Sequence, residues 1–329
     1  MKNKVIETIK KYGLIQAKDK IVLGVSGGPD SITMLDILRQ IQEEFDFEIV
    51  VAHINHMIRK EAIQDEEYVK KYCEKNSIEF FVKRIDVMSV ANNRKIGTEE
   101  AGRFVRYEFF DEILKQTESN KIAIAHNKND KVETIIMHLL RGSGLSGLKG
   151  IEPIRENVIR PLIECERKEI EKYCDENRLE PRIDKTNFEN DYTRNKIRNI
   201  VIPYIEKELN PNIIETIDRL SEVVKKEDRY LEKVALDVYD KILIKQELGQ
   251  IMLELKGFNE QDEVIKSRII LYTVKKLFGS SQGIEKIHIN DIIKLCNNNI
   301  GNKYLTPNKK IKILVKDKKI FFMAQTKDP

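Results

Sequence analysis

The sequence predicts an α/β protein in which a parallel sheet, covered by helices on both faces, precedes a long helix and a smaller α+β domain. Short apolar segments alternate with segments of helical periodicity through the first half of the chain. This alternation stops after Pro161, and a charge-rich helical pattern extends from Asn212 to about Gln246. The 329 residues also exceed what one hydrophobic core usually organises, so we expect more than one domain.

Four strands are predicted in the first half of the chain. They are KIVLGV (20–25), EIVVAHI (48–54), EFFVKRI (79–85) and KIAIAH (121–126). Apolar residues at helical spacing predict an amphipathic helix at the N-terminus and further helices over about 30–44, 64–76, 98–116 and 130–140. Strands and helices that alternate at these lengths form a parallel sheet. Ligands of such sheets bind beyond the carboxyl ends of the strands.

The second half is predicted to contain helices over 166–177 and about 191–209, followed by the long helix, whose alternating charges indicate exposure to solvent. A small domain then includes an apolar segment at 251–256, helices over about 260–278 and 286–298, and a β-rich end at 303–324. We therefore expect a first domain over 1–210, a connecting helix over 211–246 and a C-terminal domain over 247–329.

Composition argues against several classes of protein. No stretch approaches the roughly eighteen apolar residues of a membrane span, and the lysine-rich start is not a signal peptide. The four cysteines are scattered without a C-x-x-C pair, which disfavours a disulfide framework or a cysteine zinc site and favours a reducing cytoplasm. The net charge of +4 is too small to demonstrate a nucleic-acid partner.

Positive charge is concentrated near the end of the sequence. The run from Lys303 to Lys319 contains seven lysines, including Lys309, Lys310 and Lys312, and its only acidic residue is Asp317. Such a run can be a solvated strand edge protected by lysine or a nucleic-acid contact surface. Composition alone favours neither interpretation.

The loop between the first strand and the next helix carries the strongest chemical signal. It consists of Ser26, Gly27, Gly28, Pro29, Asp30 and Ser31. Glycines let backbone N–H groups approach an anion, and the serine hydroxyls and the positive helix end complete a phosphate site. The loop lacks the lysine of a Walker motif and the spacing of a dinucleotide fingerprint. Because the carboxylate of Asp30 would repel phosphate, we expect Mg²⁺ between them. The alternative is an ordinary turn in which Asp30 caps the helix.

Polar residues also follow the second strand. His53, Asn55, His56 and Arg59 lie within seven residues, which favours a polar site over an isolated structural histidine. Metal binding is the less favoured interpretation, because no third ligand is evident.

A third polar segment follows the fourth strand. His126 lies at the strand end, and Asp130 and Glu133 lie at the start of the next helix. The helix dipole explains Glu133, whereas Asp130, nearer the sheet, is the better candidate for binding a metal or an amine. Since three such segments converge on one sheet edge, we predict an active site there.

Three more segments are candidates for binding phosphate or nucleic acid. The glycine-rich RGSGLSGLKG (141–150) suits a mobile or phosphate-facing loop. Arg103 and Arg106, on one helical face, could hold a phosphate or form surface ion pairs. A mixture of basic, amide and aromatic residues at 184–198 is typical of nucleic-acid contacts and includes Asn187, Tyr192, Arg194, Asn195, Lys196 and Arg198.

Together these segments resemble a known family. SGGPDS is similar to the phosphate loop of the N-type ATP pyrophosphatases, or PP-loop proteins. The remaining segments resemble the tRNA(Ile)-lysidine synthases in this order: AHINHMIR, EEAGRFVRYEFF, AHNKNDKVETIIMHLLRGSGLSGLKGI, RPLIECERKEIEKYC and DKTNFENDYTRNKIRNIVIP. The resemblance covers about residues 18–210 and is weaker beyond them. It implies an adenine nucleotide α-hydrolase-like catalytic domain, a PP-loop ATPase fold, followed by a C-terminal domain that binds tRNA.

The resemblance also implies a reaction. ATP would adenylate carbon two of the wobble cytidine in the CAU anticodon of tRNA(Ile), releasing pyrophosphate, and free L-lysine would then displace AMP. By position, Ser26–Ser31, His53 and Asn55 would bind ATP, and Asp30 would bind Mg²⁺. Catalytic roles would fall to Asp30, Asp130, His126, Arg103 and Arg106. The tRNA would contact Arg141, Asn187, Arg194, Asn195, Arg198, Lys309, Lys310 and Lys312. A cytoplasmic enzyme without a membrane partner is implied, and a homodimer is compatible with it.

The sequence departs from the family pattern in two places. Members commonly have two adjacent aspartates where this chain has Asn129 and Asp130, which halves the negative charge there. Many bacterial members continue into another C-terminal domain, so we interpret this chain as a short-form or truncated member. The alternatives are a tRNA thiolase of the same superfamily, which usually has paired cysteines, a PP-loop ligase for a small molecule, and a nucleotide-binding regulatory module without chemistry.

Overall fold

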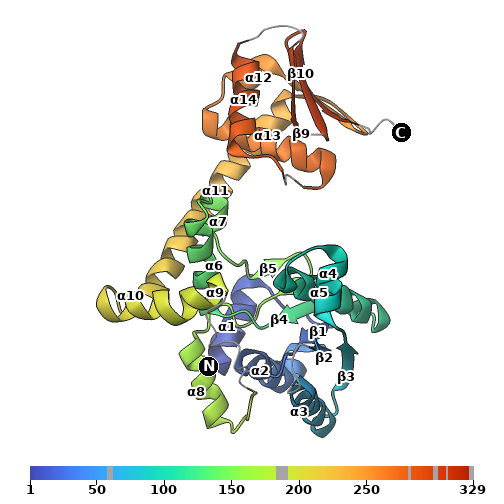
Figure 1. The fold of residues 1–329 in the computed structure, drawn as a ribbon, viewed down its shortest axis with the longest axis vertical. Coiled ribbons are helices and arrows are strands. Elements are labelled where there is room, and N and C mark those ends of the chain that lie inside the picture. The colour runs from blue at the N-terminus through green and yellow to red at the C-terminus, as the bar shows by residue number, and fades with distance from the viewer. Residues whose placement is uncertain (58–61, 183–191, 281–282, 299–302, 309, 326–329) are drawn as a thin grey trace. The chain divides into compact units, whose positions relative to one another are not determined.

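The computed structural model describes residues 1–57, 62–182, 192–280, 283–298, 303–308 and 310–325 (Figure 1). The chain divides into two compact units, Met1–Glu222 and Val223–Pro329. Each unit contains a sheet and a hydrophobic core of its own. The finer division into domains at residues 210 and 246 stays a prediction.

The sheet of the first unit has the strand order β3-β2-β1-β4-β6-β5. Its strands are β1 (Lys20–Gly24), β2 (Glu48–Asn55), β3 (Glu79–Arg84), β4 (Lys121–Ile124), β5 (Ile154–Arg155) and β6 (Val158–Ile159). All neighbours pair in parallel except β5, which pairs antiparallel with β6. The four predicted strands and their parallel arrangement are confirmed. The hairpin of β5 and β6 is not predicted, because strands of two residues leave no periodic signal.

Helices surround this sheet. They are α1 (Lys2–Tyr12), α2 (Pro29–Phe45), α3 (Ala62–Lys75), α4 (Val87–Arg94), α5 (Thr98–Gln116), α6 (Lys128–Leu140), α7 (Leu145–Leu148) and α8 (Arg167–Glu176). The predicted long helices are confirmed, whereas the short helices α4 and α7 are not predicted.

The segment expected as one helix over about 191–209 is divided in the structure. It consists of α9 (Thr193–Lys196), a wide π-helical turn η2 (Ile197–Val201) and α10 (Ile202–Glu208). Pro203, which cannot donate a backbone hydrogen bond, is the second residue of α10, after the wide turn. Wide turns of this kind are frequent at functional sites.

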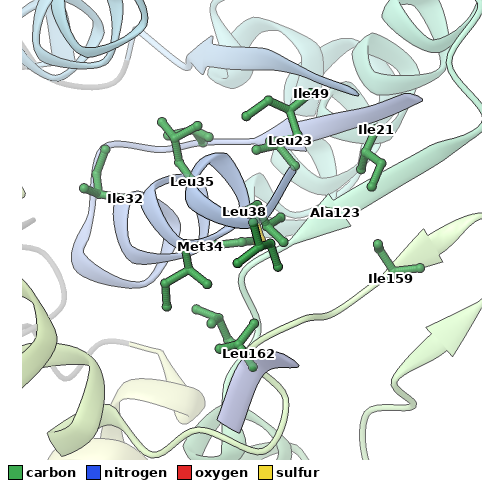
Figure 2. Packing of buried hydrophobic residues seen from close by; sticks show 14 of the residues in the cluster. Ile21, Leu23, Ile32, Met34, Leu35, Leu38, Ile49, Ala123, Ile159 and Leu162 are labelled. Atoms are coloured by element: carbon green, nitrogen blue, oxygen red, sulfur yellow. The ribbon is translucent and has the colours of Figure 1, made fainter. Parts of the chain in front are cut away.

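Alternate strand residues face helices on opposite sides of the sheet, as the pleat of a strand requires. On one side, Ile21, Leu23 and Ala123 belong to a buried cluster with residues of α1, α2, α3 and α8. Figure 2 shows this cluster, with the strand residues beside Leu35 and Leu38 of α2. On the other side, the intervening residues of β1, β2 and β4 pack against α5. Because both faces are covered, only the ends of the strands can bind a ligand.

The strand order determines which end of the sheet is open to a ligand. The chain proceeds outward from β1 to β2 and β3, and then returns to place β4 on the other side of β1. Crossover connections therefore diverge between β1 and β4, and a crevice forms at the carboxyl ends of these two strands. The loop Ser26–Ser31 follows β1, and His126 and Asp130 follow β4.

A buried carboxylate anchors α2, the helix that begins in this loop. The Asp36 carboxylate accepts hydrogen bonds from the hydroxyls of Tyr72 (2.6 Å) and Tyr173 (2.7 Å) and from Gln40 Nε2 (2.8 Å). Burial alone would raise the pKa of Asp36, but these donors and Arg39 outweigh it and hold that pKa below its usual value. Since the tyrosines come from α3 and α8, one ionised group fixes three helices together.

The second unit contains an antiparallel sheet of order β7-β8-β11-β10-β9. Its elements are β7 (Leu243–Glu247), β8 (Gln250–Glu254), α12 (Leu255–Asn259), α13 (Glu263–Phe278), α14 (Lys286–Asn297), β9 (Lys303–Asn308), β10 (Ile311–Lys316) and β11 (Lys319–Ala324). Phe258 and Phe322 are fully buried in its core. The smaller α+β domain predicted after the long helix is confirmed.

The long helix α11 (Ile213–Ile242) begins in the first unit and ends in the second. It is shorter than predicted, because residues from Leu243 onward pair with β8. It is also less exposed than predicted, since Tyr239 and Ile242 are buried in the core of the second unit. Within the described ranges, every helix is too short or too polar to cross a membrane.

Candidate functional site

A cavity of about 810 Å³ lies in the first unit at the carboxyl ends of β1, β2 and β4. Its walls come from the loop after β1, the ends of β2 and β4, and helices α5 and α8, together with residues 194–199. The predicted site residues that line it are Ser26, Gly28, Pro29, Asp30, Ser31, His53, Arg106, His126, Asp130, Arg194, Asn195 and Arg198. The three polar segments that the sequence places at one sheet edge therefore meet in one cavity.

The loop after β1 is held by the hydroxyl of Ser31. Ser31 Oγ accepts hydrogen bonds from the N–H groups of Ser26 and Gly27, each at 3.1 Å, and donates to Gly28 O at 3.0 Å. Gly27 has a φ of 94°, which a side chain would strain. The N-terminus of α2 has no side-chain cap, and its first residue is Pro29. Within the described structure the N–H groups of Asp30 and Ser31, in the first turn of α2, are therefore left to donate to an anion.

Close packing sets the position of α5 beside this loop. A Cβ atom at Gly24 would lie 2.4 Å from Phe110 Cζ, so only glycine allows the ring to approach the end of β1. Arg106, one helical turn before Phe110, consequently lines the cavity. Arg106 has no ion-pair partner among the residues that the structure describes. Burial lowers its pKa, yet a guanidinium remains protonated at neutral pH, so this cation favours an anionic ligand.

Asn127 connects the two carboxylates of the cavity. Its side chain donates to Asp30 Oδ1 at 2.8 Å and accepts from the N–H of Asp130 at 2.9 Å. Its own N–H donates to Asp130 Oδ2 at 3.0 Å, which completes a capping box at the start of α6. The buried amide therefore fixes both aspartates relative to the end of β4.

Two arginines bind the other side of Asp130. Nη2 of Arg194 and of Arg198 lie 3.1 and 3.0 Å from Asp130 Oδ1. Both side chains also pair with Glu133, with Nε–oxygen distances of 2.9 and 2.6 Å. Glu133 is buried, and its partners explain its position better than the helix dipole does. These arginines, predicted to contact nucleic acid, thus lie mostly buried in an ion-pair cluster.

The two aspartates are electrostatically different. Burial and the nearby charge of Asp130 raise the pKa of Asp30 to about 6. Burial would also raise the pKa of Asp130, but the charges of Arg194 and Arg198 and the backbone N–H of Asn127 outweigh it and lower that pKa. Asp130 therefore stays ionised and paired, whereas the one hydrogen bond that the Asp30 carboxylate accepts from a described residue comes from the amide of Asn127.

Asp30 fits the type of ligand that Mg²⁺ uses. Mg²⁺ commonly binds one or two carboxylates and completes its coordination with water and substrate phosphates. Among the described residues, no group of three or more His, Cys, Asp or Glu side chains could form an all-protein metal site. The donor set therefore suits a cation that arrives with a phosphorylated ligand.

The histidines of the cavity are neutral. His53 Nδ1 donates to Val25 O at 2.8 Å, and burial lowers the pKa of its imidazole. Burial and the nearby charge of Arg106 lower the pKa of His56 to about 4, and burial lowers that of His126 to about 4. The Nδ1 atom of His56 is buried without a hydrogen-bond partner in the described structure.

Several predicted residues lie elsewhere. Asn55 donates to Glu66 at 3.1 Å and accepts from Met57 N, which supports the turn after β2. Arg103 stacks on Tyr107 at 5.5 Å and is exposed. Arg141 is exposed at the end of α6.

The remaining predicted residues are not in the described part of the first unit. Lys310 and Lys312 belong to the second unit. Asn187, Lys309 and Arg59 lie outside the described residues.

The segment 141–150 corrects a prediction. Instead of facing the cavity it folds back on α6, where His138 Nδ1 donates to Gly147 O at 2.8 Å. Ser221 Oγ of α11 donates to Lys149 O at 2.9 Å. Its glycines therefore serve a tight helix end, with φ of 71° at Gly142 and 66° at Gly150.

Three arginines near the cavity are not predicted from the sequence. Arg167 and Arg182 line it, and Arg182 N donates to Gly27 O at 2.9 Å, beside the phosphate loop. Arg160 donates to His126. The residues that they contact are distant in the sequence, so only the fold reveals their positions. Asn129 accepts from the N–H of Arg167 at 2.9 Å and so supports α8.

Comparisons with known proteins agree with this geometry. The family model of the PP-loop domain matches residues 1–205. The chain is 48% identical over 310 residues to a tRNA(Ile)-lysidine synthase from Clostridium acetobutylicum, covering 94% of this chain and 67% of the relative. It is 46% identical to one from Clostridioides difficile, covering 92% and 66%. The chain thus spans about two thirds of the length of these relatives.

A solved structure supports the fold alone. The U34-tRNA thiolase NcsA from Methanococcus maripaludis superposes with a TM-score of 0.55 at 18% identity, covering 67% of this chain and 77% of the thiolase.

The raised pKa of Asp30 predicts that the ionised form of this side chain destabilises the folded protein. Because the folded pKa of about 6 exceeds the unfolded value, Asp30 contributes stability only while protonated, and this contribution is lost as the pH rises through about 6. Asp30→Asn, which keeps the acceptor for Asn127, should raise the free energy of unfolding at pH 8 by roughly 1–3 kcal/mol. The gain should vanish near pH 4.

Urea unfolding at both pH values measures this difference. Asp111→Asn, which removes an exposed carboxylate of α5, is the control and should change little. A variant Asp30→Asn that is no more stable than the wild type at pH 8 would contradict the electrostatic description of the site.

Proposed function

The chain belongs to the tRNA(Ile)-lysidine synthase family of PP-loop proteins, and we propose that it ligates free L-lysine to a tRNA(Ile) at the expense of ATP. In the first step ATP would adenylate carbon two of the wobble cytidine in the CAU anticodon and release pyrophosphate. In the second step the amine of lysine would displace AMP. The reaction would therefore form a carbon–nitrogen bond.

One observation carries this proposal: the uncapped helix N-terminus, the loop Ser26–Ser31 and the half-buried Asp30 share one cavity with cations. An uncapped N-terminus presents N–H donors and a positive dipole to phosphate. Arg106, Arg167 and Arg182 add positive charge along the walls. Adenylation depends mainly on positioning and on neutralising phosphate charge, and this combination supplies both.

Asp30 is the residue proposed to hold Mg²⁺. When bound there, Mg²⁺ would neutralise charge on the phosphates of ATP. Asn127 holds the Asp30 carboxylate at the open end of β1, so the side chain is positioned before a ligand arrives. Ser26 and Ser31 orient the loop, and His53 lies at the end of β2 with its Nε2 atom left as an acceptor.

The lysine step calls for an anion site and a proton acceptor. Arg106 is proposed to bind either the α-phosphate or the carboxylate of lysine, since it lies in the cavity without a carboxylate partner in the described structure. Asp130 is occupied by two guanidinium groups and a backbone N–H. We therefore propose that Asp130 organises the cavity instead of accepting a proton or binding a metal directly. Arg103, exposed beside Tyr107, is left as a candidate for the RNA.

The tRNA would contact both units. In the first unit Arg141 is exposed, Asn195 lines the cavity, and Arg194 and Arg198 would act from the cavity wall. In the second unit Lys312 Nζ lies 4.3 Å from the ring centroid of Tyr304, which is exposed, and Lys310 is exposed nearby. A cation beside an exposed ring suits an RNA backbone and an unstacked base. A cytoplasmic location follows from this substrate, and a homodimer stays a prediction.

The tRNA thiolase alternative is less well supported. Thiolases need reactive sulfur, whereas Cys73, Cys165, Cys174 and Cys296 are all buried. Burial raises the pKa of Cys73, Cys165 and Cys296 to about 12, so their thiols are poor nucleophiles. All four belong to the described part of the chain, and none lines the cavity. If the protein were a ligase for a small molecule, the second unit would have no substrate to bind. If it were a regulatory module without chemistry, it would not need the carboxylate of Asp30.

Lysine transfer tests the proposal directly. The wild type, with ATP and Mg²⁺, should attach radiolabelled lysine to a tRNA(Ile) with a CAU anticodon and not to tRNA(Met) with the same anticodon. Asp30→Asn should reduce kcat/KM for the transfer by about 100-fold or more, because charge stabilisation at phosphate is lost. Asp111→Asn should transfer lysine normally. Lysine incorporation at the wild-type rate by Asp30→Asn would refute the role of the carboxylate, and no incorporation by the wild type would refute the reaction.

Charge reversal tests the surface of the second unit. Lys310→Glu combined with Lys312→Glu should weaken tRNA binding at least tenfold and should reduce the slope of log affinity against log salt by about 2, for two lost phosphate contacts. Filter binding over a range of salt concentrations measures both quantities. The control, Lys226→Glu with Lys233→Glu on α11, changes the net charge equally. Equal losses in both double variants would show that only net charge matters, and an unchanged salt slope would mark the lysines as a protected strand edge.

A further inference from the structure

Arg160 contacts the imidazole of His126 from behind the cavity. It directly follows β6 and is almost completely buried, with 5% of its surface exposed. Its Nε donates to His126 Nδ1 at 3.2 Å, and its Nη1 donates to Glu152 O at 2.6 Å. Its backbone N–H also donates to Pro153 O at 3.0 Å. Bonds from the side chain and the backbone therefore fix the guanidinium in one orientation.

The identity of the donor determines the protonation of His126. Arginine carries N–H donors and no acceptor, and it does not lose its proton in proteins. His126 Nδ1 must therefore present its lone pair to Arg160. A proton on that nitrogen would place two donors against each other, and a doubly protonated imidazole would also place two positive charges together. The neutral imidazole consequently carries its proton on Nε2.

The charges around His126 support the neutral form. Arg160 follows β6, Arg194 belongs to α9 and Arg106 to α5, and all three oppose a positive imidazole. Asp130 of α6 favours it, but burial and the arginines outweigh this carboxylate and lower the pKa of His126 to about 4. His126 lines the cavity, and its Nε2 has no hydrogen-bond partner among the residues that the structure describes.

We propose that Arg160 is a positioning residue that holds His126 as a neutral hydrogen-bond donor, and that His126 Nε2–H binds a phosphate oxygen of the nucleotide in the cavity. His126 lies in the same cavity as the phosphate loop and the first turn of α2, so one ligand can reach both. The inference rests on the proposed function only in naming a nucleotide phosphate as the ligand.

The assignment excludes a different role for this histidine. A base that takes a proton from the lysine amine needs an unprotonated nitrogen facing the substrate. The nitrogen with the lone pair faces Arg160, and the nitrogen left for a ligand carries the proton. His126 therefore contributes to the step in which charge develops on phosphate, and lysine loses its proton elsewhere. A hydrogen-bond donor at such a position typically contributes about 100-fold to the rate.

Two substitutions of His126 separate a donor from a base. Glutamine retains an N–H donor near the position of Nε2 and cannot act as a base, whereas leucine offers neither. We expect His126→Gln to release pyrophosphate, with RNA and ATP but without lysine, within about tenfold of the wild type, and His126→Leu to lose about 100-fold. Equal losses in the two variants, or a loss confined to the lysine step, would overturn the donor role.

The tautomer is measured independently of activity. In the whole protein with labelled histidine, nitrogen NMR should show a protonated Nε2 and an unprotonated Nδ1 for His126 from about pH 5 to 8, with the signals assigned by their absence in His126→Gln. Arg160→Met should release this constraint, so that His126 titrates or exchanges between tautomers, and Arg160→Lys should restore the wild-type pattern at least in part. A protonated Nδ1 in the wild type, or an unchanged pattern in a folded Arg160→Met, would refute the role of Arg160.

These readouts separate the two proposals. If the wild type shows the expected tautomer and His126→Gln retains pyrophosphate release, but no lysine reaches the RNA, then the proposed function fails while the assignment of Arg160 and His126 stands. If lysine transfer is normal and the tautomer is reversed, only the assignment fails.

Discussion

The structure depends on how two aspartates are accommodated at the carboxyl ends of β1 and β4. The strand order brings Asp30 and Asp130 into one cavity, where like charges repel. The protein neutralises only one of them. Arg194 and Arg198 bind Asp130 and Glu133, and this cluster holds the wide helical turn η2 against α6. Asn127 then connects the neutralised carboxylate to the free one.

This division of charge explains the chemistry of the cavity. Asp30 is left ionisable beside an uncapped helix N-terminus, which suits a cation that accompanies phosphates. Arg106, Arg167 and Arg182 supply the positive charge that anions need. His126, set by Arg160, adds a neutral donor. The arrangement costs stability, because the free carboxylate is partly buried. Proteins whose ligand-free binding sites contain an unpaired charge are commonly less stable than they could be.

Much of the fold could be predicted from the sequence, because buried parallel strands are continuous apolar runs and long helices repeat every three to four residues. The loop Ser26–Ser31 can also be recognised from the sequence, because its residues are consecutive. Contacts between residues that are distant in the sequence cannot be predicted in this way. Nothing around Arg194 indicates that its partner is Glu133, some sixty residues earlier, and basic residues among amides resemble an RNA surface equally well. For the same reason, the hydrogen-bond partner of Asn55 and the role of Arg160 can be identified only from the folded structure.

In the proposed mechanism Asp30 holds the cation of the nucleotide while Asp130 stays paired with arginine. Crystals grown with Mn²⁺ and a non-hydrolysable ATP analogue test it most directly, because anomalous scattering locates the metal. We expect Mn²⁺ between the Asp30 carboxylate and the phosphates, with Arg194 and Arg198 still bound to Asp130. Mn²⁺ coordinated by Asp130, or phosphates bound away from the N-terminus of α2, would contradict it.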